Sequence, residues 1–419
     1  MEIKKFMEFI EKSPTCFHAV ENLKAMVIEA GFEDVDKKGT IIKKGGSYFK
    51  VRNDSSIIAF KIPNGDDFTS FRMTTAHSDS PCYKVKANPT IYKHGYTLLN
   101  VAPYGGMIHS TFFDRPLKVA GRVAYLNKEN QVVSKLINFD KPNVMIANLA
   151  IHFNREVNNG YQYKPAKDIV PILGLGEIDL LKLIEKKFNL ENEIIAHDLF
   201  VCSDTKPYIW GENDEFISSP RLDDLECAYA SFRALVNSNA NEAPMALVFN
   251  NEEVGSSSYM GADSDLLYTV LIKIQEDLNK NSSWLFDCLR ESFAIHGDNA
   301  HGLHPNYTES YDLNNCTMIN NGPVIKYSPS QKYTTDSLTA AKFIGLCKET
   351  GINYQAFENH SNVLGGSTLG NILNAQVSIP SVDIGLPQLA MHSAFETAGT
   401  KDFEDLIKVY ITHFSYKNK

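Results

Sequence analysis

The chain has 419 residues, of which 43% are hydrophobic, so it is long enough for two domains and can bury a sizeable core. Its net charge is −9 at pH 7, and no cluster of Lys and Arg offsets the acidic balance. We therefore expect a protein that binds neither nucleic acid nor an anionic membrane surface.

The cysteines and the N-terminus indicate the compartment. The seven cysteines are odd in number and scattered, and no two form a CxxC pair, so neither a disulfide framework nor a thiolate zinc site is predicted. Apolar residues at 3, 6, 7 and 10 predict an amphipathic helix and not a signal peptide. No stretch approaches the roughly 20 apolar residues that a membrane helix needs. We expect a soluble, cytoplasmic protein.

The first part of the chain alternates helices and strands. After the N-terminal helix, the pattern predicts a second helix over Phe17–Ala30 and strands over Ser56–Ile62 and Thr69–Thr75. From about Lys84 to Trp210 the pattern changes to short β-like runs separated by Gly, Asn and Pro. This part is predicted to hold four strands and one helix, at Ile91–Tyr92, Thr97–Val101, Leu117–Leu126, Met145–Ile151 and Ile178–Phe188.

From Ser219 the alternation of helices and strands resumes. The predicted elements are a helix over Asp224–Asn237, a strand over Met245–Phe249, a helix over Leu266–Leu278 and a last helix from Asp402. We therefore predict an α/β fold in which a catalytic domain, residues 1–84 and 211–419, is interrupted by an inserted β-rich domain, residues 85–210. No internal repeat or low-complexity tract is present in the sequence.

Two adjacent glutamates, Glu252 and Glu253, follow the strand predicted at Met245–Phe249. This apolar run is typical of a buried parallel strand, and ligands bind at the carboxyl ends of such strands. Neighbouring side chains on a strand point in opposite directions, so one carboxylate can hold a cation while the other faces the molecule that the cation binds. A solvated loop with two surface charges is the alternative.

Two further acidic motifs flank predicted elements. His77 and Asp79, two residues apart in an extended segment, share one face. A carboxylate bonded to the second nitrogen of a histidine raises its basicity toward a metal, although the motif alone more often marks a surface histidine. Asp223 and Asp224 precede the helix Leu225–Leu235, where one can bridge two cations or both can complement the helix dipole.

The last third of the chain adds histidines. Asp298, His301 and His304 follow a predicted strand at Ser292–His296, a high density for a chain with twelve histidines. His301 and His304 either face the substrate or shape their loop. Between the strand predicted at Ile379–Leu386 and the last helix, His392 is followed by Glu396, and a partly buried structural histidine is the alternative for His392.

These positions predict a metal site at one edge of one sheet. The five proposed ligands are His77, Asp223, Glu253, Asp298 and His392. Imidazole and carboxylate without thiolate suit catalytic zinc, manganese or cobalt, and five ligands with one bridging carboxylate suit two divalent ions that activate a shared water. Glu252 then remains free as the general base.

The motifs TTAHSDSPC, SPRLDDL, FNNEEVGS, GDNAHGLHPNY, GPVIKYSPSQKY, GGSTLGNIL and VDIGLPQLAMHS occur in this order. Together they resemble the aspartyl aminopeptidase family of di-zinc metallopeptidases, and the resemblance runs through nearly the whole chain. It implies that His77, Asp223 and Asp298 hold one metal and that Asp223, Glu253 and His392 hold the other. It also implies that Asp79 orients His77 and that Glu252 is the base.

The resemblance implies further roles. The segment LAIHFNREVN is similar to a family segment whose histidine, here His152, reaches the active site of a neighbouring subunit. Family members build tetrahedral homo-oligomers, commonly of twelve chains, through the inserted domain. Lys326 matches a lysine of the first substrate pocket, where it either pairs with an acidic substrate side chain or serves as a salt-bridged structural residue. The family has a neutral residue where this chain has Asp224, so either Asp223 or Asp224 is the bridging acid.

We therefore predict a cytoplasmic metallo-aminopeptidase that removes N-terminal residues from peptides, with acidic residues as one possible preference. Two alternatives remain open at this point. One is another di-metal amidohydrolase, such as a carboxypeptidase or a deacylase. The other is a non-catalytic assembly or cargo protein with the same fold.

Overall fold

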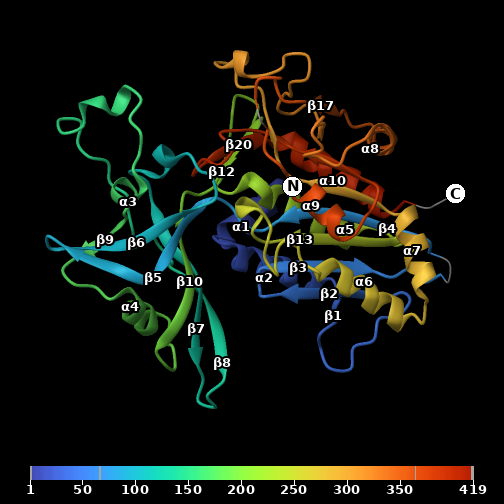
Figure 1. The fold of residues 1–419 in the computed structure, drawn as a ribbon, viewed down its shortest axis with the longest axis horizontal. Helices are drawn as coiled ribbons and strands as arrows, with labels where there is room; N and C mark the ends of the chain where they lie inside the picture. Colours follow the sequence, from blue (N-terminus) through green and yellow to red (C-terminus); the bar gives the residue numbers. More distant parts are fainter. Residues whose placement is uncertain (1, 66–67, 364, 417–419) are drawn as a thin grey trace.

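A nine-stranded mixed sheet forms the centre of the computed structural model, which describes residues 2–65, 68–363 and 365–416. In spatial order its strands are β1 (Glu33–Asp34), β2 (Ser47–Arg52), β3 (Ser56–Lys61), β13 (Ala243–Phe249), β4 (Phe71–His77), β14 (Phe293–Gly297), β18 (Ser381–Gly385), β16 (Val324–Lys326) and β17 (Gln355–Phe357). The four strands β13, β4, β14 and β18 are parallel. Their carboxyl ends therefore share one edge of the sheet (Figure 1).

Helices cover both faces of this sheet, because its parallel strands are apolar on both sides. One face carries α1 (Glu2–Lys12), α2 (Cys16–Glu29), α5 (Leu222–Asn237), α8 (Ser337–Thr350) and α10 (Thr400–Phe414). The other carries α6 (Leu266–Asp277), α7 (Ser282–Glu291) and α9 (Leu369–Gln376). Along β13, Ala246 and Val248 enter the first core, whereas Met245, Leu247 and Phe249 enter the second.

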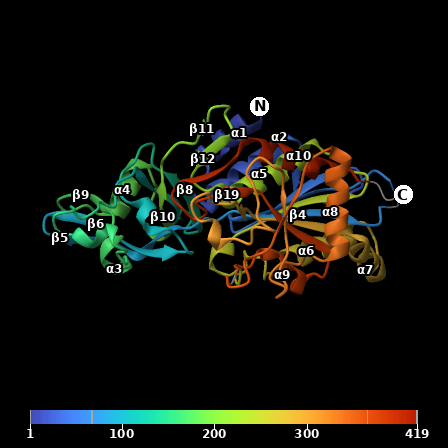
Figure 2. The ribbon, with the colours of Figure 1, turned by 90° about the horizontal axis from the view of Figure 1, so that it is seen from above.

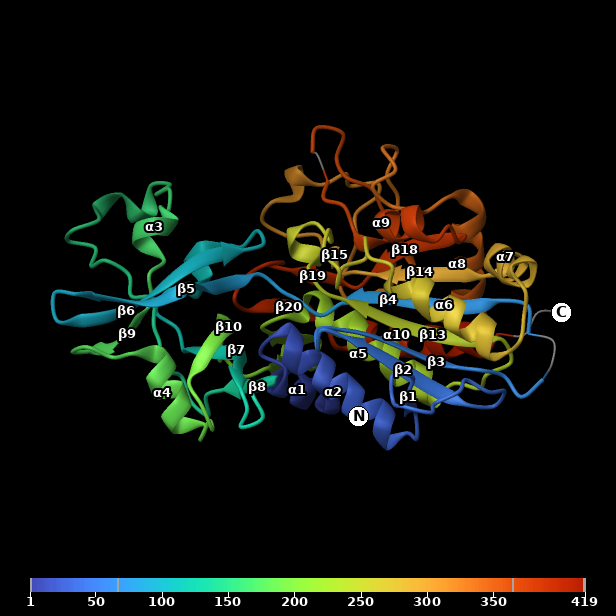
Figure 3. The same ribbon diagram turned by 60° about the horizontal axis from the view of Figure 1, so that its bottom comes forward.

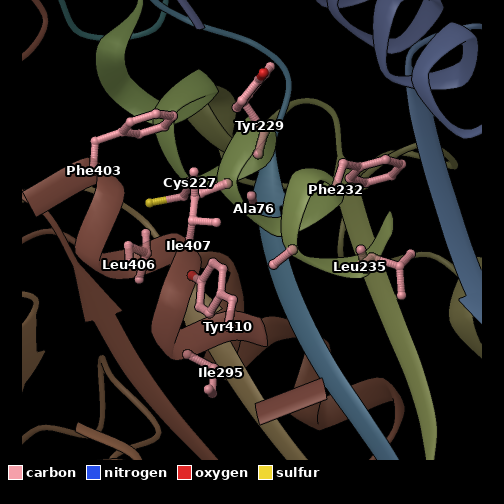
Figure 4. Packing of buried hydrophobic residues seen from close by; sticks show 14 of the residues in the cluster. Ala76, Cys227, Tyr229, Phe232, Leu235, Ile295, Phe403, Leu406, Ile407 and Tyr410 are labelled. Atoms are coloured by element: carbon pink, nitrogen blue, oxygen red, sulfur yellow. The ribbon is translucent and has the colours of Figure 1, made fainter. Parts of the chain in front are cut away.

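The first core joins α5 and α10 to the sheet. Figure 4 shows Phe232 and Leu235 of α5 near Ala76 of β4, and Ile407 and Tyr410 of α10 in the same cluster. All five side chains are buried. This packing fixes the start of α5, and therefore the residues that precede its regular turns, against the carboxyl end of β4.

A six-stranded antiparallel sheet stands beside this domain. In spatial order its strands are β8 (Val132–Asn138), β7 (Leu117–Leu126), β10 (Ile194–Ser203), β5 (Cys82–Lys93), β6 (Tyr96–Tyr104) and β9 (Ile172–Leu175). The helices α3 (Pro165–Asp168) and α4 (Leu180–Lys187) belong to the same part of the chain. Figures 2 and 3 show this sheet set to one side of the nine-stranded sheet. Arg122 links the two, since it donates to the backbone oxygen of Asn53 at 3.0 Å and lies 4.4 Å from the ring of Phe17.

A third sheet of five strands connects loops that are distant in sequence. It runs β11 (Tyr208–Trp210), β12 (Phe216–Ser219), β20 (Glu396–Gly399), β19 (Pro387–Leu389) and β15 (Ala300–His301). Four 3-10 turns complete the described elements: η1 (His109–Phe112), η2 (Arg155–Asn158), η3 (Glu252–Val254) and η4 (Thr308–Ser310). The pairing of β12 with β20 and of β20 with β19 brings the start of α5 close to the loop that carries His392.

Most elements predicted from the sequence are confirmed, including the strand Leu117–Leu126 with the same bounds. The strand predicted at Met145–Ile151 is wrong. Met145 bridges to Ile172, the next residue bridges to Phe113, and residues 151–153 form a turn. Because successive backbone groups pair with different segments, no continuous ladder develops. The fold class is confirmed as α/β, and no helix of the described residues is long and apolar enough to cross a bilayer.

Candidate metal centre

The centre lies at the carboxyl edge of the parallel strands. β4 ends at His77, which is in register with Phe249 at the end of β13. η3, with its two glutamates, follows β13 after two residues, and Asp298 follows β14 directly. Three neighbouring strands therefore deliver acidic side chains and one imidazole to the same edge, as is usual for ligand sites of α/β sheets.

Asp223 lies between two histidines. Its Oδ1 atom is 3.5 Å from Nε2 of His77, and its Oδ2 atom is 3.4 Å from Nε2 of His392. Asp224 points elsewhere, because its Oδ2 accepts a hydrogen bond from the backbone N–H of His77 at 3.1 Å. Desolvation opposes ionisation of Asp223, but its contacts with His392 and His77 lower its pKa, whereas burial raises the pKa of Asp224.

Both histidines are held through Nδ1, so that Nε2 faces the centre. Nδ1 of His77 lies 3.0 Å from the backbone oxygen of Asp79, and Nδ1 of His392 lies 2.5 Å from that of Gly106. A carbonyl oxygen only accepts hydrogen bonds, so Nδ1 carries the proton in both rings. Metal-binding histidines are typically oriented in this way.

Asp79 supports the glutamate pair as well as His77. Its carboxylate is 3.5 Å from Nδ1 of His77, which is too long for a strong hydrogen bond. Its Oδ1 and Oδ2 accept the backbone N–H groups of Glu252 and Glu253, each at 3.2 Å. Asp79 is itself buried. The carboxylate therefore fixes the turn that presents both glutamates.

Two overlapping groups of side chains have ligand atoms within 4.8 Å of one another. They are His77, Glu252 and Glu253, and Asp223, Glu253 and His392. Oε1 of Glu253 is 3.4 Å from Nε2 of His392. Burial raises the pKa of Glu253, and burial together with nearby carboxylates raises the pKa of Glu252 to about 8.

Asp298 belongs to neither group and pairs with Lys326 instead. Lys326 is only 4% exposed, and its Nζ donates to Oδ1 of Asp298 at 2.9 Å and to the backbone oxygen of Asn299 at 2.8 Å. Burial opposes the charge of Lys326, but Asp298 raises its pKa. Asp298 also raises the pKa of Glu252, so its carboxylate lies close to the centre.

The residues present fit a divalent metal. Among the described residues, none donates a hydrogen bond to the buried Oδ1 of Asp223 or Oε1 of Glu253. Such oxygens are costly in a protein interior unless a proton or a cation satisfies them. Carboxylate and imidazole donors without thiolate are typical of catalytic zinc sites.

Three supporting residues were missed or left without a role by sequence reasoning. The hydroxyl of Tyr104 donates to Oδ2 of Asp79 at 2.7 Å. Glu396 accepts the backbone N–H groups of Asp223, at 3.1 Å, and His392, at 2.7 Å. Gly105 has φ +76°, and a Cβ added there would lie 3.1 Å from Cβ of Glu253. Only the Gly105-Gly106 pair is a local sequence signal, and it indicates a tight turn without a function.

Three predicted residues remain, and each has a different environment. His301 is exposed, its ring lies 6.0 Å from that of Phe357, and loss of hydration and the charge of Lys326 lower its pKa. His304 contacts its own loop, since its Nδ1 accepts the backbone N–H of Asn306 at 3.2 Å and its ring lies 4.8 Å from that of Tyr307. His152 lies in an exposed turn just before η2.

Comparisons with known sequences agree with this site. The family model described as Aminopeptidase I zinc metalloprotease (M18) matches residues 9–414. A probable M18 family aminopeptidase 2 of Clostridium acetobutylicum is 43% identical over 414 residues, which cover 95% of each chain. A protein of the same description from Ectopseudomonas mendocina is 38% identical over 424 residues, covering 99% of this chain and 98% of the relative.

Solved structures agree as well. The chain superposes on a structure of the Ape4 and Nbr1 complex with a TM-score of 0.93 and 32% identity, covering 98% of this chain and 85% of that one. It superposes on the S. cerevesiae mApe1 dodecamer with a TM-score of 0.87 and 26% identity, covering 99% and 96%. The aminopeptidase function is thereby favoured over the carboxypeptidase, deacylase and non-catalytic alternatives. The chain belongs to the M18 family of zinc metallo-aminopeptidases, hydrolases that act on peptide bonds.

Proposed function

We propose that this aminopeptidase holds two zinc ions and that Asp223, rather than Asp224, is shared between them. The observation that carries the proposal is that the two oxygens of Asp223 face the Nε2 atoms of two different histidines, at 3.5 and 3.4 Å. In this assignment one ion is held by His77, Asp223 and Asp298, and the other by Asp223, Glu253 and His392. Asp224 is already engaged with the backbone of β4.

When bound, zinc supplies a Lewis acid for the scissile carbonyl and lowers the pKa of water. Glu252 is the proton carrier, because neither proposed ligand set needs it and its backbone is fixed by Asp79. Its raised pKa, about 8, suits a group that must both take and return a proton near neutral pH. Glu252 accepts the proton of the attacking water and then delivers it to the leaving amine, which regenerates the carboxylate.

Substrate selection is assigned to the part of the centre around Asp298 and Lys326. Lys326 uses two hydrogen bonds to hold Asp298 and Asn299, and an ammonium group has three donors. We assign the third to an acidic side chain at the N-terminus of the peptide, with His301 beside it. His304, which contacts its own loop, shapes the entrance to the same pocket.

The assembly proposal concerns the six-stranded sheet and its loops. We assign residues 85–210 to an inserted oligomerisation domain and residues 1–84 and 211–419 to the catalytic domain. Exposed apolar side chains near His152, which include Leu149, Ile151 and Phe153, support a contact with a second copy of the chain. A structural relative is described as a dodecamer, and we propose a tetrahedral dodecamer in the cytoplasm, with His152 completing the active site of a neighbouring copy.

The roles of the two adjacent glutamates give a direct test. Glu252→Gln should abolish hydrolysis of aminoacyl reporters and keep the zinc content near that of the wild type, whereas Glu253→Gln should lose zinc. Glu242→Gln is the matched control. Glu242 is buried at the other end of β13, where it accepts the backbone N–H groups of Thr69 and Ser70 at 2.9 and 3.0 Å, and its variant should retain both zinc and turnover.

Zinc would be measured by elemental analysis after gel filtration, and turnover with free and N-acetylated reporters. A reversed pattern, with zinc lost in Glu252→Gln and retained in Glu253→Gln, would exchange the two roles. Binding of one ion per chain at full activity would refute the dinuclear assignment.

A further inference from the structure

Two cysteines lie opposite each other where the six-stranded sheet meets the metal centre. β10 and β5 are antiparallel, with Val201 opposite Tyr83, so the next position of the same register sets Cys202 against Cys82. Opposed residues of antiparallel strands have Cα atoms about 4.5–5.5 Å apart, and a disulfide bond needs about 4.4–6.8 Å. Both cysteines are free thiols.

The two thiols already interact. Interaction between the two side chains raises the pKa of Cys82 and lowers that of Cys202, and the charges of Arg221 and Lys118 lower the pKa of Cys202 further. The thiolate is the reactive form of cysteine. A third thiol nearby, that of Cys16, has its pKa raised by burial and therefore stays protonated.

A cavity gives access to this pair. Cys82 and Cys202 both line it, together with Asp79 and Tyr104. Cys82 is half-buried and Cys202 is buried. A small oxidant that enters the cavity therefore reaches the two sulfur atoms. In the same cavity lie Asp79 and Tyr104, which support the metal centre.

The pair is connected to the metal centre along two short routes. Cys82 is opposite Tyr104 in the pairing of β5 with β6, and the Tyr104 hydroxyl donates to Asp79 at 2.7 Å. Cys82 also follows Asp79 by only three positions in the sequence. Asp79 in turn accepts the backbone N–H groups of Glu252 and Glu253.

We propose that Cys82 and Cys202 form a reversible cross-strand disulfide under hydroperoxide and that the bond lowers aminopeptidase activity. The Cys202 thiolate attacks a peroxide oxygen, which gives a sulfenic acid and, after protonation, one water. The Cys82 thiol attacks that sulfur and releases a second water. In sum, two thiols and hydrogen peroxide give one disulfide and two waters, and two electrons pass from sulfur to oxygen. A dithiol reductant reverses the reaction by exchange.

The expected loss of activity follows from the geometry. A disulfide holds its two sulfur atoms about 2.05 Å apart, closer than two free thiols approach, so its formation shifts Cys82 and the partners that connect it to Asp79. Disturbing a group that supports metal ligands typically costs 10–100-fold in metal affinity or activity. We expect kcat/KM of the oxidised enzyme to fall by roughly tenfold.

The test uses the full-length, zinc-loaded enzyme treated with an equimolar amount of hydrogen peroxide. Free thiols are then blocked, the disulfide is mapped by peptide mass spectrometry, and kcat/KM is measured before and after dithiothreitol. The wild type should lose two thiols to a Cys82–Cys202 crosslink, lose activity about tenfold, and recover on reduction. Cys202→Ser and Cys82→Ser should stay active under the same oxidant, whereas Cys16→Ser and Cys316→Ser should respond like the wild type.

Several results would overturn the proposal. They are a crosslink that involves other cysteines, no crosslink in the wild type, a mapped Cys82–Cys202 crosslink with unchanged kcat/KM, and an activity loss that persists in Cys202→Ser. Mapping of the wild type needs no variant, so the proposal stays testable even if one serine variant fails to fold.

Discussion

Replacing Tyr104 with phenylalanine removes one hydroxyl group and keeps the ring, which packs edge-on against Phe200 with ring centroids 5.7 Å apart. The hydroxyl donates to Asp79 at 2.7 Å and accepts from Nδ2 of Asn251 at 2.9 Å. Burial raises the pKa of Tyr104, so the phenol remains a donor throughout the pH range of the enzyme. The substitution therefore removes one hydrogen bond from a buried carboxylate.

The size of the effect follows from these contacts. A hydrogen bond to a charged group contributes about 1.5–3 kcal/mol, and each ~1.4 kcal/mol is a factor of ten in an equilibrium constant. Asp79 still accepts the backbone N–H groups of Glu252 and Glu253, but its carboxylate is positioned less firmly without the Tyr104 hydroxyl. If the lost energy appears in metal binding, the zinc dissociation constant should rise by roughly 10–100-fold.

Zinc affinity would be measured by competition with a chromophoric chelator. Tyr161→Phe is the matched control, because Tyr161 donates to Oδ2 of Asp168 at 3.0 Å, remote from the nine-stranded sheet. This control should bind zinc like the wild type. Wild-type zinc affinity in Tyr104→Phe, or an equal loss of affinity in Tyr161→Phe, would refute the inference that the hydrogen bond from Tyr104 to Asp79 strengthens zinc binding.

Three further outcomes are expected. Lys326→Leu should slow hydrolysis of Asp and Glu substrates more than that of Leu and Ala substrates, and an equal loss on all four would limit Lys326 to holding Asp298. His152→Phe and Glu252→Gln should each be nearly inactive as pure oligomers but regain activity in co-expressed mixtures, and verified mixtures without activity would refute a shared site. Burial lowers the pKa of His413 to about 3 from 6.5. The unfolded chain therefore binds the extra proton below pH 6.5, and the contribution of His413 to the free energy of unfolding should fall by about 2 kcal/mol between pH 6.5 and 4.5. Denaturant titrations at several pH values should show a smaller fall in the free energy of unfolding for His413→Gln than for the wild type. An equal fall in both proteins would contradict the low pKa of His413.

The strand ends that carry the centre were predictable from local pattern. Apolar runs ended by His77 and by the Glu252-Glu253 pair follow the periodicity of buried strands, and parallel strands align their carboxyl ends. Which of Asp223 and Asp224 faces the two histidines was not predictable. It depends on backbone angles at the start of α5, where Asp223 has ψ 112° and Asp224 has φ −117°, both outside the helical range. These angles turn the two carboxylates toward different partners.

The sequence by itself determined the α/β pattern, the acidic and imidazole character of the centre and the residues most suited to bind a metal, because each depends on residue type and short-range periodicity. Only the tertiary structure decided what supports that centre. Tyr104 meets Asp79 from β6, and Glu396 meets Asp223 across 173 positions of the chain. Such contacts arise when separate sheets pack together, and a local pattern carries no information about which distant side chain will fill the space beside it.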